Sequence, residues 1–159
     1  MKIHGEELLR GFFEKGFDPE TVPKHLEHAF KIKITPSLTL GGTIDRVDEL
    51  KNGSIEIIDY KTGQAPKTKD ASKDKQLTMY ALAATDKGVY AKNPEDVIVS
   101  FYYFENQTKV SAKRNRKDLD AIKEHIAKTA QTMSESTFQP NPGFHCDFCE
   151  YRLICEAWQ

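Results

Sequence analysis

The sequence has no long hydrophobic run: no stretch approaches the roughly 18 apolar residues of a membrane-spanning helix. Its first residues also lack the pattern of a signal peptide. Neither sign of charge is in excess, because 23 Lys and Arg are balanced by 24 Asp and Glu. Such a chain has no overall attraction to nucleic acid, so an enzyme acting on nucleic acid would have to concentrate its positive charge locally.

Cysteine is scarce and confined to one end, since all three cysteines lie within the last fourteen residues. This distribution excludes the disulfide framework of a small secreted protein. We therefore expect a reducing, cytoplasmic location and no membrane partner. With 159 residues, of which 38% are hydrophobic and 30% charged, the chain is long enough for one globular domain with its own core.

The hydrophobic pattern predicts a mixture of helices and strands. Helices are expected at residues 5–17, 73–87 and 117–134. Strands are expected at residues 27–34, 38–49, 54–61 and 97–104, with a short partner strand around Val110. The order α-β-β-β-α-β-α predicts an α/β fold with a central mixed β-sheet flanked by helices. The strand at 97–104 is apolar without alternation, so we expect it to be buried on both faces.

Residues 41–64 are predicted to form a β-hairpin that turns at Lys51-Asn52-Gly53. Alternation along its second strand places four side chains on one face: Ile55, Ile57, Asp59 and Lys61. The isoleucines make this a core face. A carboxylate and an ammonium at its far end are costly unless something pairs with them.

The length of the turn decides whether Asp45, on the first strand, shares that face. A two-residue loop would put Asp45 and Asp59 on opposite faces of the hairpin. A three-residue loop, with Gly53 left-handed in a G1 bulge, sets the two carboxylates directly opposite each other, with Cβ atoms about 5 Å apart. We predict the three-residue loop, because this spacing lets both carboxylates share one cation.

Two carboxylates and a lysine at the end of a buried hairpin indicate a metal site. Carboxylate oxygens suit a hard cation such as magnesium or manganese. A metal there can activate water and clamp a phosphoryl oxygen, while the ammonium offsets charge developing on phosphorus. The alternative is a salt-bridged hairpin on a solvated edge, against which the neighbouring isoleucines argue.

Three motifs resemble those of the RecB-like nucleases of the PD-(D/E)XK superfamily. They are Gly-Thr-Ile-Asp-Arg-Val-Asp at 42–48, Ile-Ile-Asp-Tyr-Lys-Thr-Gly at 57–63 and Gln76-Leu-Thr-Met-Tyr80. The order and spacing of the motifs match that family, and so does the predicted order of helices and strands. The resemblance covers nearly the whole chain and implies a restriction-endonuclease-like core.

The resemblance also implies a role for each motif residue. Three groups would bind Mg2+ or Mn2+: Asp45, Asp59 and the backbone carbonyl of Tyr60. Lys61 would be the catalytic lysine that assists the attacking water. Gln76 and Tyr80 share a helix face at i, i+4 and would orient the lysine and the DNA strand.

Some RecB-like nucleases have a further metal ligand, a histidine near the start of the first helix. His4, directly before Gly5-Glu6-Glu7-Leu8, matches that histidine in position. The resemblance therefore implies a metal-ligand role for His4. The alternative, a solvated side chain beside the terminus, stays open.

The cysteine tail, Cys146-x2-Cys149-x5-Cys155, resembles that of the iron–sulfur members of this family, such as AddB-type proteins. Those members ligate a 4Fe-4S cluster with a fourth cysteine far upstream, and this chain has none there. We expect the chain to be a C-terminal fragment of a larger protein whose cluster is incomplete here. Zinc with His145 as fourth ligand, or three reduced cysteines packed as small apolar residues, are the alternatives.

Basic residues cluster in two places. Three lysines follow the catalytic loop, where a phosphate backbone would have to lie, and are predicted to bind nucleic acid: Lys67, Lys69 and Lys73. The second group is expected to form a solvated face: Lys113, Arg114, Arg116 and Lys117.

These observations predict a metal-dependent DNA nuclease, exonuclease-like, that hydrolyses phosphodiester bonds. Residues 1–139 would form the nuclease core and residues 140–159 its cysteine-containing tail. The resemblance implies the nuclease module of a helicase–nuclease in DNA repair or recombination, with DNA and a helicase as partners. The alternatives are an inactive nuclease fold that binds DNA or docks a helicase, and an iron–sulfur or zinc scaffold protein.

Overall fold

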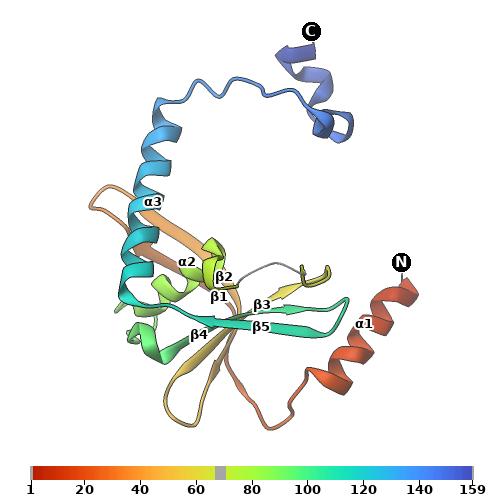
Figure 1. The fold of residues 1–159 in the computed structure, drawn as a ribbon, viewed down its shortest axis with the longest axis vertical. Coiled ribbons are helices and arrows are strands. Elements are labelled where there is room, and N and C mark those ends of the chain that lie inside the picture. Colours follow the sequence, from red (N-terminus) through yellow and green to blue (C-terminus); the bar gives the residue numbers. More distant parts are fainter. Residues whose placement is uncertain (1, 67–70, 159) are drawn as a thin grey trace. The chain divides into compact units, whose positions relative to one another are not determined.

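Within residues 2–66 and 71–158, which the computed structural model describes, five strands form one mixed sheet (Figure 1). The strands lie in the order β1 (Pro23–Lys33), β2 (Thr39–Glu49), β3 (Ile55–Lys61), β4 (Val97–Tyr103) and β5 (Thr108–Lys113). Neighbouring strands are antiparallel except β3 and β4, which are parallel. The helices are α1 (Lys2–Lys15), α2 (Lys75–Thr85) and α3 (Arg116–Glu135). The predicted α/β fold with a central mixed sheet is confirmed.

The chain divides into two compact units, Met1–Ala127 and Lys128–Gln159, and helix α3 crosses from one to the other. The first unit contains the sheet, α1 and α2. The second contains the end of α3 and three short 3₁₀ turns: Phe144–Phe148, Arg152–Ile154 and Glu156–Trp158. Among the described residues, no helix has the length and apolarity to cross a bilayer.

Helix α2 is the crossover between the parallel strands β3 and β4, and it forms the core with one face of the sheet. Its buried residues include Leu77 and Ala81, which belong to one apolar cluster with Ile57 of β3 and Val99 of β4. The helix begins at an N-cap, Asp74, whose carboxylate accepts the N–H of Leu77. This cap fixes the start of the helix that carries the Gln76–Tyr80 motif.

Helix α2 ends earlier than the sequence indicates. Its last residue is Thr85, and the following Asp86 is extended. The carboxylate of Asp86 accepts the N–H of Gly88 at 2.7 Å, which closes a turn beyond the helix. The helix therefore ends two residues before the predicted end at residue 87, because the Asp86 side chain bonds to the backbone two residues on and favours a turn.

Strand β4 is buried on both faces, as predicted: six of its seven residues are buried. Helix α1 accounts for the second face. Its Phe12 makes edge contacts with Tyr60 of β3 and Tyr102 of β4, at centroid distances of 6.0 and 5.2 Å. The side chain of Gln107 joins α1 to the β4–β5 turn by donating to the carbonyls of Leu8 and Phe104.

The turn of the β2–β3 hairpin has the predicted three-residue loop. Leu50 and Ser54 close it with a backbone hydrogen bond of 2.8 Å, and the N–H of Gly53 also bonds to the carbonyl of Leu50. Gly53 has a φ of 81°, the left-handed conformation that the G1 bulge requires. The pairs that follow include Val47 opposite Ile57. This is the predicted register.

Replacing Gly53 with Ala is expected to lower the free energy of unfolding by about 1 kcal/mol, because an L-residue is strained at positive φ. Gly53 is suited to this test since an added Cβ would meet no atom within 4 Å. Gly63→Ala is the matched control: it also faces open space, without a positive φ. We expect its effect to stay within about 0.5 kcal/mol. Urea unfolding measures both, and equal losses would contradict the assignment of strain to Gly53.

Candidate active site

The two aspartates of the hairpin lie on the face of the sheet that α2 covers. The β2–β3 ladder runs as far as the pair Arg46–Ile58, and the next residues in this register are Asp45 and Asp59. Beyond the ladder, Oδ2 of Asp45 accepts the backbone N–H of Tyr60 at 2.9 Å. The carboxylate of Asp45 thus holds the backbone of β3 next to Asp59.

Asp59 is a buried carboxylate, with 3% of its surface exposed. Its Oδ1 accepts hydrogen bonds from Gln76 Nε2 and the Tyr80 hydroxyl, both at 2.9 Å. Its Oδ2 lies 2.6 Å from Nζ of Lys61 as an ion pair. No other donor of the described residues bonds to Oδ2, so the Lys61 ammonium is its one partner there.

Lys61 is held by three groups. Its ammonium donates to Oε1 of Gln76 at 3.0 Å, ion-pairs with Asp59 and lies 5.0 Å from the centre of the Phe101 ring. An ammonium has three N–H donors, so one remains for water or substrate beyond the Gln76 and Asp59 contacts. One third of the Lys61 side chain is exposed, which leaves it accessible.

Gln76 and Tyr80 connect α2 to the strands. The amide of Gln76 accepts from Lys61 with its oxygen and donates to Asp59 and to the Tyr80 hydroxyl with its nitrogen. Burial, and next the negative charge of Asp59, raise the pKa of the Tyr80 phenol. Tyr80 therefore stays a neutral donor to Asp59 at physiological pH.

The donor set fits a hard divalent cation. Asp45 and Asp59 supply carboxylate oxygens, and Oδ2 of Asp59 contacts no donor of the described residues besides the Lys61 ammonium. Among the described residues, no group of three or more His, Cys, Asp and Glu side chains has metal-binding geometry. The side chains thus provide two ligands, and other ligands would be a backbone carbonyl, water or substrate oxygens. Magnesium, which keeps several waters, suits such a site.

His4 is not brought into a group with the two aspartates. It lies on α1, and its Nε2 is 2.7 Å from Oε1 of Glu105 in the β4–β5 turn. The sequence did not indicate this partner, because the two residues are far apart in the chain. The metal-ligand role of His4 stays a prediction.

The cysteines lie in the second unit. Cys146 accepts the N–H of Gly143 at 3.3 Å, and none of Cys146, Cys149 and Cys155 is buried or disulfide-bonded. The described residues bring no fourth ligand to them. Cys149 is exposed, whereas Cys146 and Cys155 are half-buried, so packing as small apolar residues stays an alternative for these two. The iron–sulfur cluster and the zinc alternative stay predictions.

Of the three lysines predicted to bind nucleic acid, the structure describes only Lys73. Lys67 and Lys69 lie outside the described residues. Lys73 ends the 3₁₀ turn Ala71–Lys73, directly before α2, and is exposed. The role of Lys73 in nucleic-acid binding stays a prediction.

The role of Arg114 was not predicted from the sequence. Expected on a solvated face, it is 3% exposed. Its guanidinium donates to Oγ1 of Thr78 and to the carbonyls of Ala71 and Asp74, at 2.7, 2.6 and 3.2 Å. It thereby holds the turn before α2. Alternation along β5 could have indicated this burial. The strand's residues alternate in exposure, and Arg114 directly after it continues the series of less exposed positions.

Replacing Arg114 with Lys is expected to lower the free energy of unfolding by at least about 2 kcal/mol, because carbonyl and hydroxyl groups lose their buried donors. Arg116→Lys is the control, since Arg116 is exposed at the start of α3 and should change stability by less than about 0.5 kcal/mol. Urea unfolding compares the two. A similar effect of both substitutions would show that the Arg114 hydrogen bonds contribute little.

Comparisons with known proteins identify the family and the fold. Residues 5–156 match the PD-(D/E)XK nuclease superfamily. The crystal structure of SSO0001 is similar over 99% of this chain and 71% of that chain, with a TM-score of 0.51 and 18% sequence identity, which shows a common fold. Comparison with curated proteins gave no match. Because the match to the superfamily spans nearly the whole chain, the protein belongs to the PD-(D/E)XK nuclease superfamily.

Proposed function

We propose that the protein is a metal-dependent deoxyribonuclease that hydrolyses phosphodiester bonds at the Asp45–Asp59–Lys61 site. The observation that carries the proposal is the hydrogen-bonded connection of a buried aspartate to a lysine through one glutamine: Gln76 bonds to both Asp59 and Lys61. A buried carboxylate held in this way against a partly exposed ammonium is costly to maintain for stability alone. Its position at an accessible strand end supports a catalytic role.

The residues have separable tasks in this proposal. Asp45, Asp59 and the Tyr60 carbonyl would hold Mg2+ or Mn2+, which would activate water and polarise the phosphate when bound. Lys61 would use its remaining N–H donor to position the attacking water or to neutralise charge on the phosphoryl oxygens. Gln76 and Tyr80 would fix Asp59 and Lys61, and so reduce the reorganisation that the reaction requires.

The finer assignments rest on the resemblance to RecB-like nucleases. We propose DNA as substrate, exonuclease-like action, and a helicase as partner in DNA repair or recombination. Three free cysteines fit a reducing, cytoplasmic setting. The cysteine tail would complete an iron–sulfur cluster only with a ligand from outside the described residues.

Asp45→Asn and Asp59→Asn should each lower the rate of DNA cleavage by more than about 100-fold. Mutating a residue that only hydrogen-bonds to a metal ligand typically lowers activity by roughly 10- to 100-fold, and a direct ligand should matter more. Each Asn keeps the side-chain shape and removes the negative charge. The assay uses labelled single- and double-stranded DNA, and RNA, with Mg2+, Mn2+ or EDTA. Asp120→Asn is the matched control, because Asp120 is exposed on α3, and its rate should be unchanged.

If the wild-type protein binds the metal but cuts none of these substrates, the nuclease proposal is wrong and the protein is an inactive nuclease fold. Cleavage that survives in both aspartate variants would place the reaction elsewhere on the chain.

Metal binding can be measured without any nucleic acid. At Mn2+ concentrations of about 100 times its Kd, a ligand that binds only the folded state adds about 2.7 kcal/mol of stability. For a protein of this size that raises Tm by roughly 5–10 °C. The Asp59→Asn variant should lose this shift and Asp120→Asn should keep it. An equal shift in both variants would assign the metal to other residues.

A further inference from the structure

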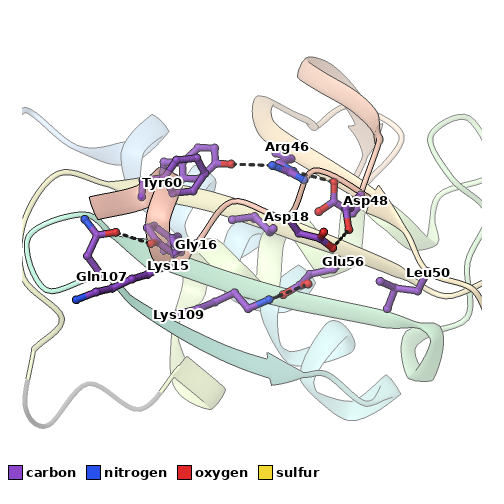
Figure 2. A pocket seen from close by; sticks show the side chains of 14 residues that line it. Lys15, Gly16, Asp18, Arg46, Asp48, Leu50, Glu56, Tyr60, Gln107 and Lys109 are labelled. Carbon is purple, nitrogen blue, oxygen red and sulfur yellow. Dashed lines mark hydrogen bonds and ion pairs between the residues drawn. The ribbon is translucent and has the colours of Figure 1, made fainter. Parts of the chain in front are cut away.

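A cavity of about 310 Å³ lies on the sheet face opposite Asp59, between the end of α1 with its following loop and strands β2 to β5 (Figure 2). Because side chains alternate along a strand, the residues next to Asp45 and Asp59 in the chain line this cavity. Arg46 follows Asp45 on β2, and Tyr60 follows Asp59 on β3, so both point away from α2 and line the cavity. Nothing in the nuclease mechanism uses this cavity.

Buried charged groups form one part of the lining. Arg46 is 9% exposed; its Nε donates to Asp48 at 2.8 Å and its Nη1 to the Tyr60 hydroxyl at 3.4 Å. A guanidinium has five N–H donors, so three have no hydrogen-bond partner among the described residues. Glu56 provides a buried negative charge, and its carboxylate accepts hydrogen bonds from Lys109 and Ser100.

The charges that line the cavity balance. The cations are Lys15, Arg46 and Lys109, and the anions are Asp18, Asp48 and Glu56. A ligand with a net charge would meet an equal number of like charges and would leave its own charge uncompensated. An uncharged ligand with both donors and acceptors can satisfy the Arg46 donors and the carboxylate oxygens together.

The rest of the lining is aromatic and aliphatic. Phe12, Tyr60 and Tyr102 meet edge to face, and Leu50 and Ile58 add aliphatic surface. Such walls favour a planar ring. The volume is at the lower end of the roughly 300–1,000 Å³ of small-molecule pockets. We propose that the cavity binds a nucleobase or nucleoside, an uncharged planar heterocycle that offers N–H donors and carbonyl or ring-nitrogen acceptors.

Such a ligand would be coupled to the nuclease site, and this part of the inference rests on the proposed function. The ring of Tyr60 lines the cavity while its backbone N–H holds Oδ2 of Asp45. A ligand that contacts Tyr60 or Arg46 therefore acts on the backbone that sets the spacing of Asp45 and Asp59. Because coupling is reciprocal, the ligand and the divalent cation must change each other's affinity by the same factor.

Binding is tested first without metal or nucleic acid, so that its result does not depend on nuclease activity. Calorimetric titrations with adenosine and guanosine measure Kd, and their 5′-monophosphates and ribose test the charge and ring arguments. We expect a nucleoside to bind more tightly than its monophosphate, and ribose not to bind. Absence of nucleoside binding, or a monophosphate that binds about tenfold more tightly, would overturn the proposal.

Variants locate the ligand. Lys109→Met removes a lining donor and should weaken nucleoside binding about tenfold, the effect of one hydrogen bond to a charged group. Lys113→Met is the matched control: it lies on the same strand, donates to the Glu95 carbonyl and does not line the cavity. Leu50→Trp, which narrows the cavity, is a second variant in case Lys109→Met is unstable. Equal weakening by the Lys113 substitution would place the ligand elsewhere.

Two further titrations identify the source of the base and the coupling. A short oligonucleotide that competes with the nucleoside would show that a base of a nucleic acid strand enters the cavity, and lack of competition would indicate a free nucleoside. The Mn2+ affinity is then measured with and without nucleoside. An unchanged Mn2+ affinity overturns the coupling, whereas loss of cleavage in every assay overturns the nuclease proposal and leaves the binding result standing.

Discussion

The buried carboxylate of Asp59 is the group on which the arrangement of the site depends. At 3% exposure, its charge costs several kcal/mol unless neighbours compensate it. The compensating groups come from two elements, Lys61 on β3 and the Gln76–Tyr80 pair on α2. The position of α2 along the sheet is therefore an electrostatic requirement as well as a packing one. The Asp74 cap and the Arg114 hydrogen bonds serve it by fixing where the helix begins.

A single pair of strands serves two surfaces, because neighbouring residues of a strand point to opposite faces. On one face, Asp59 contacts α2 and Asp45 accepts the backbone N–H of Tyr60. On the other, the side chains of Arg46 and Tyr60 line a cavity beside α1. The three-residue loop at Gly53 sets this division for the whole hairpin, since a shift of one residue would exchange the faces of β2 relative to β3. Site and cavity thus depend on one turn.

Features set by local chemistry could be predicted from the sequence. The hairpin register follows from alternation and from a glycine that permits positive φ, and the order of strands and helices follows from hydrophobic periodicity. Features set by contacts between distant segments could not. The burial of Arg114 depends on the turn before α2, and the pairing of His4 with Glu105 depends on how α1 docks. The cavity has no sequence motif, because its residues come from a helix, the loop after it, two turns and four strands.

In the proposed nuclease, the ion pair of Lys61 with Asp59 gives the lysine two states. The Lys61 ammonium is the one partner of Oδ2 of Asp59 among the described residues, so a cation and the ammonium would compete for this oxygen. Gln76 binds Lys61 independently of that oxygen, through its amide oxygen at 3.0 Å. When Asp59 is otherwise engaged, Lys61 would therefore stay in place with two donors free instead of one. The glutamine is what allows one lysine both to stabilise the buried carboxylate and to serve the substrate.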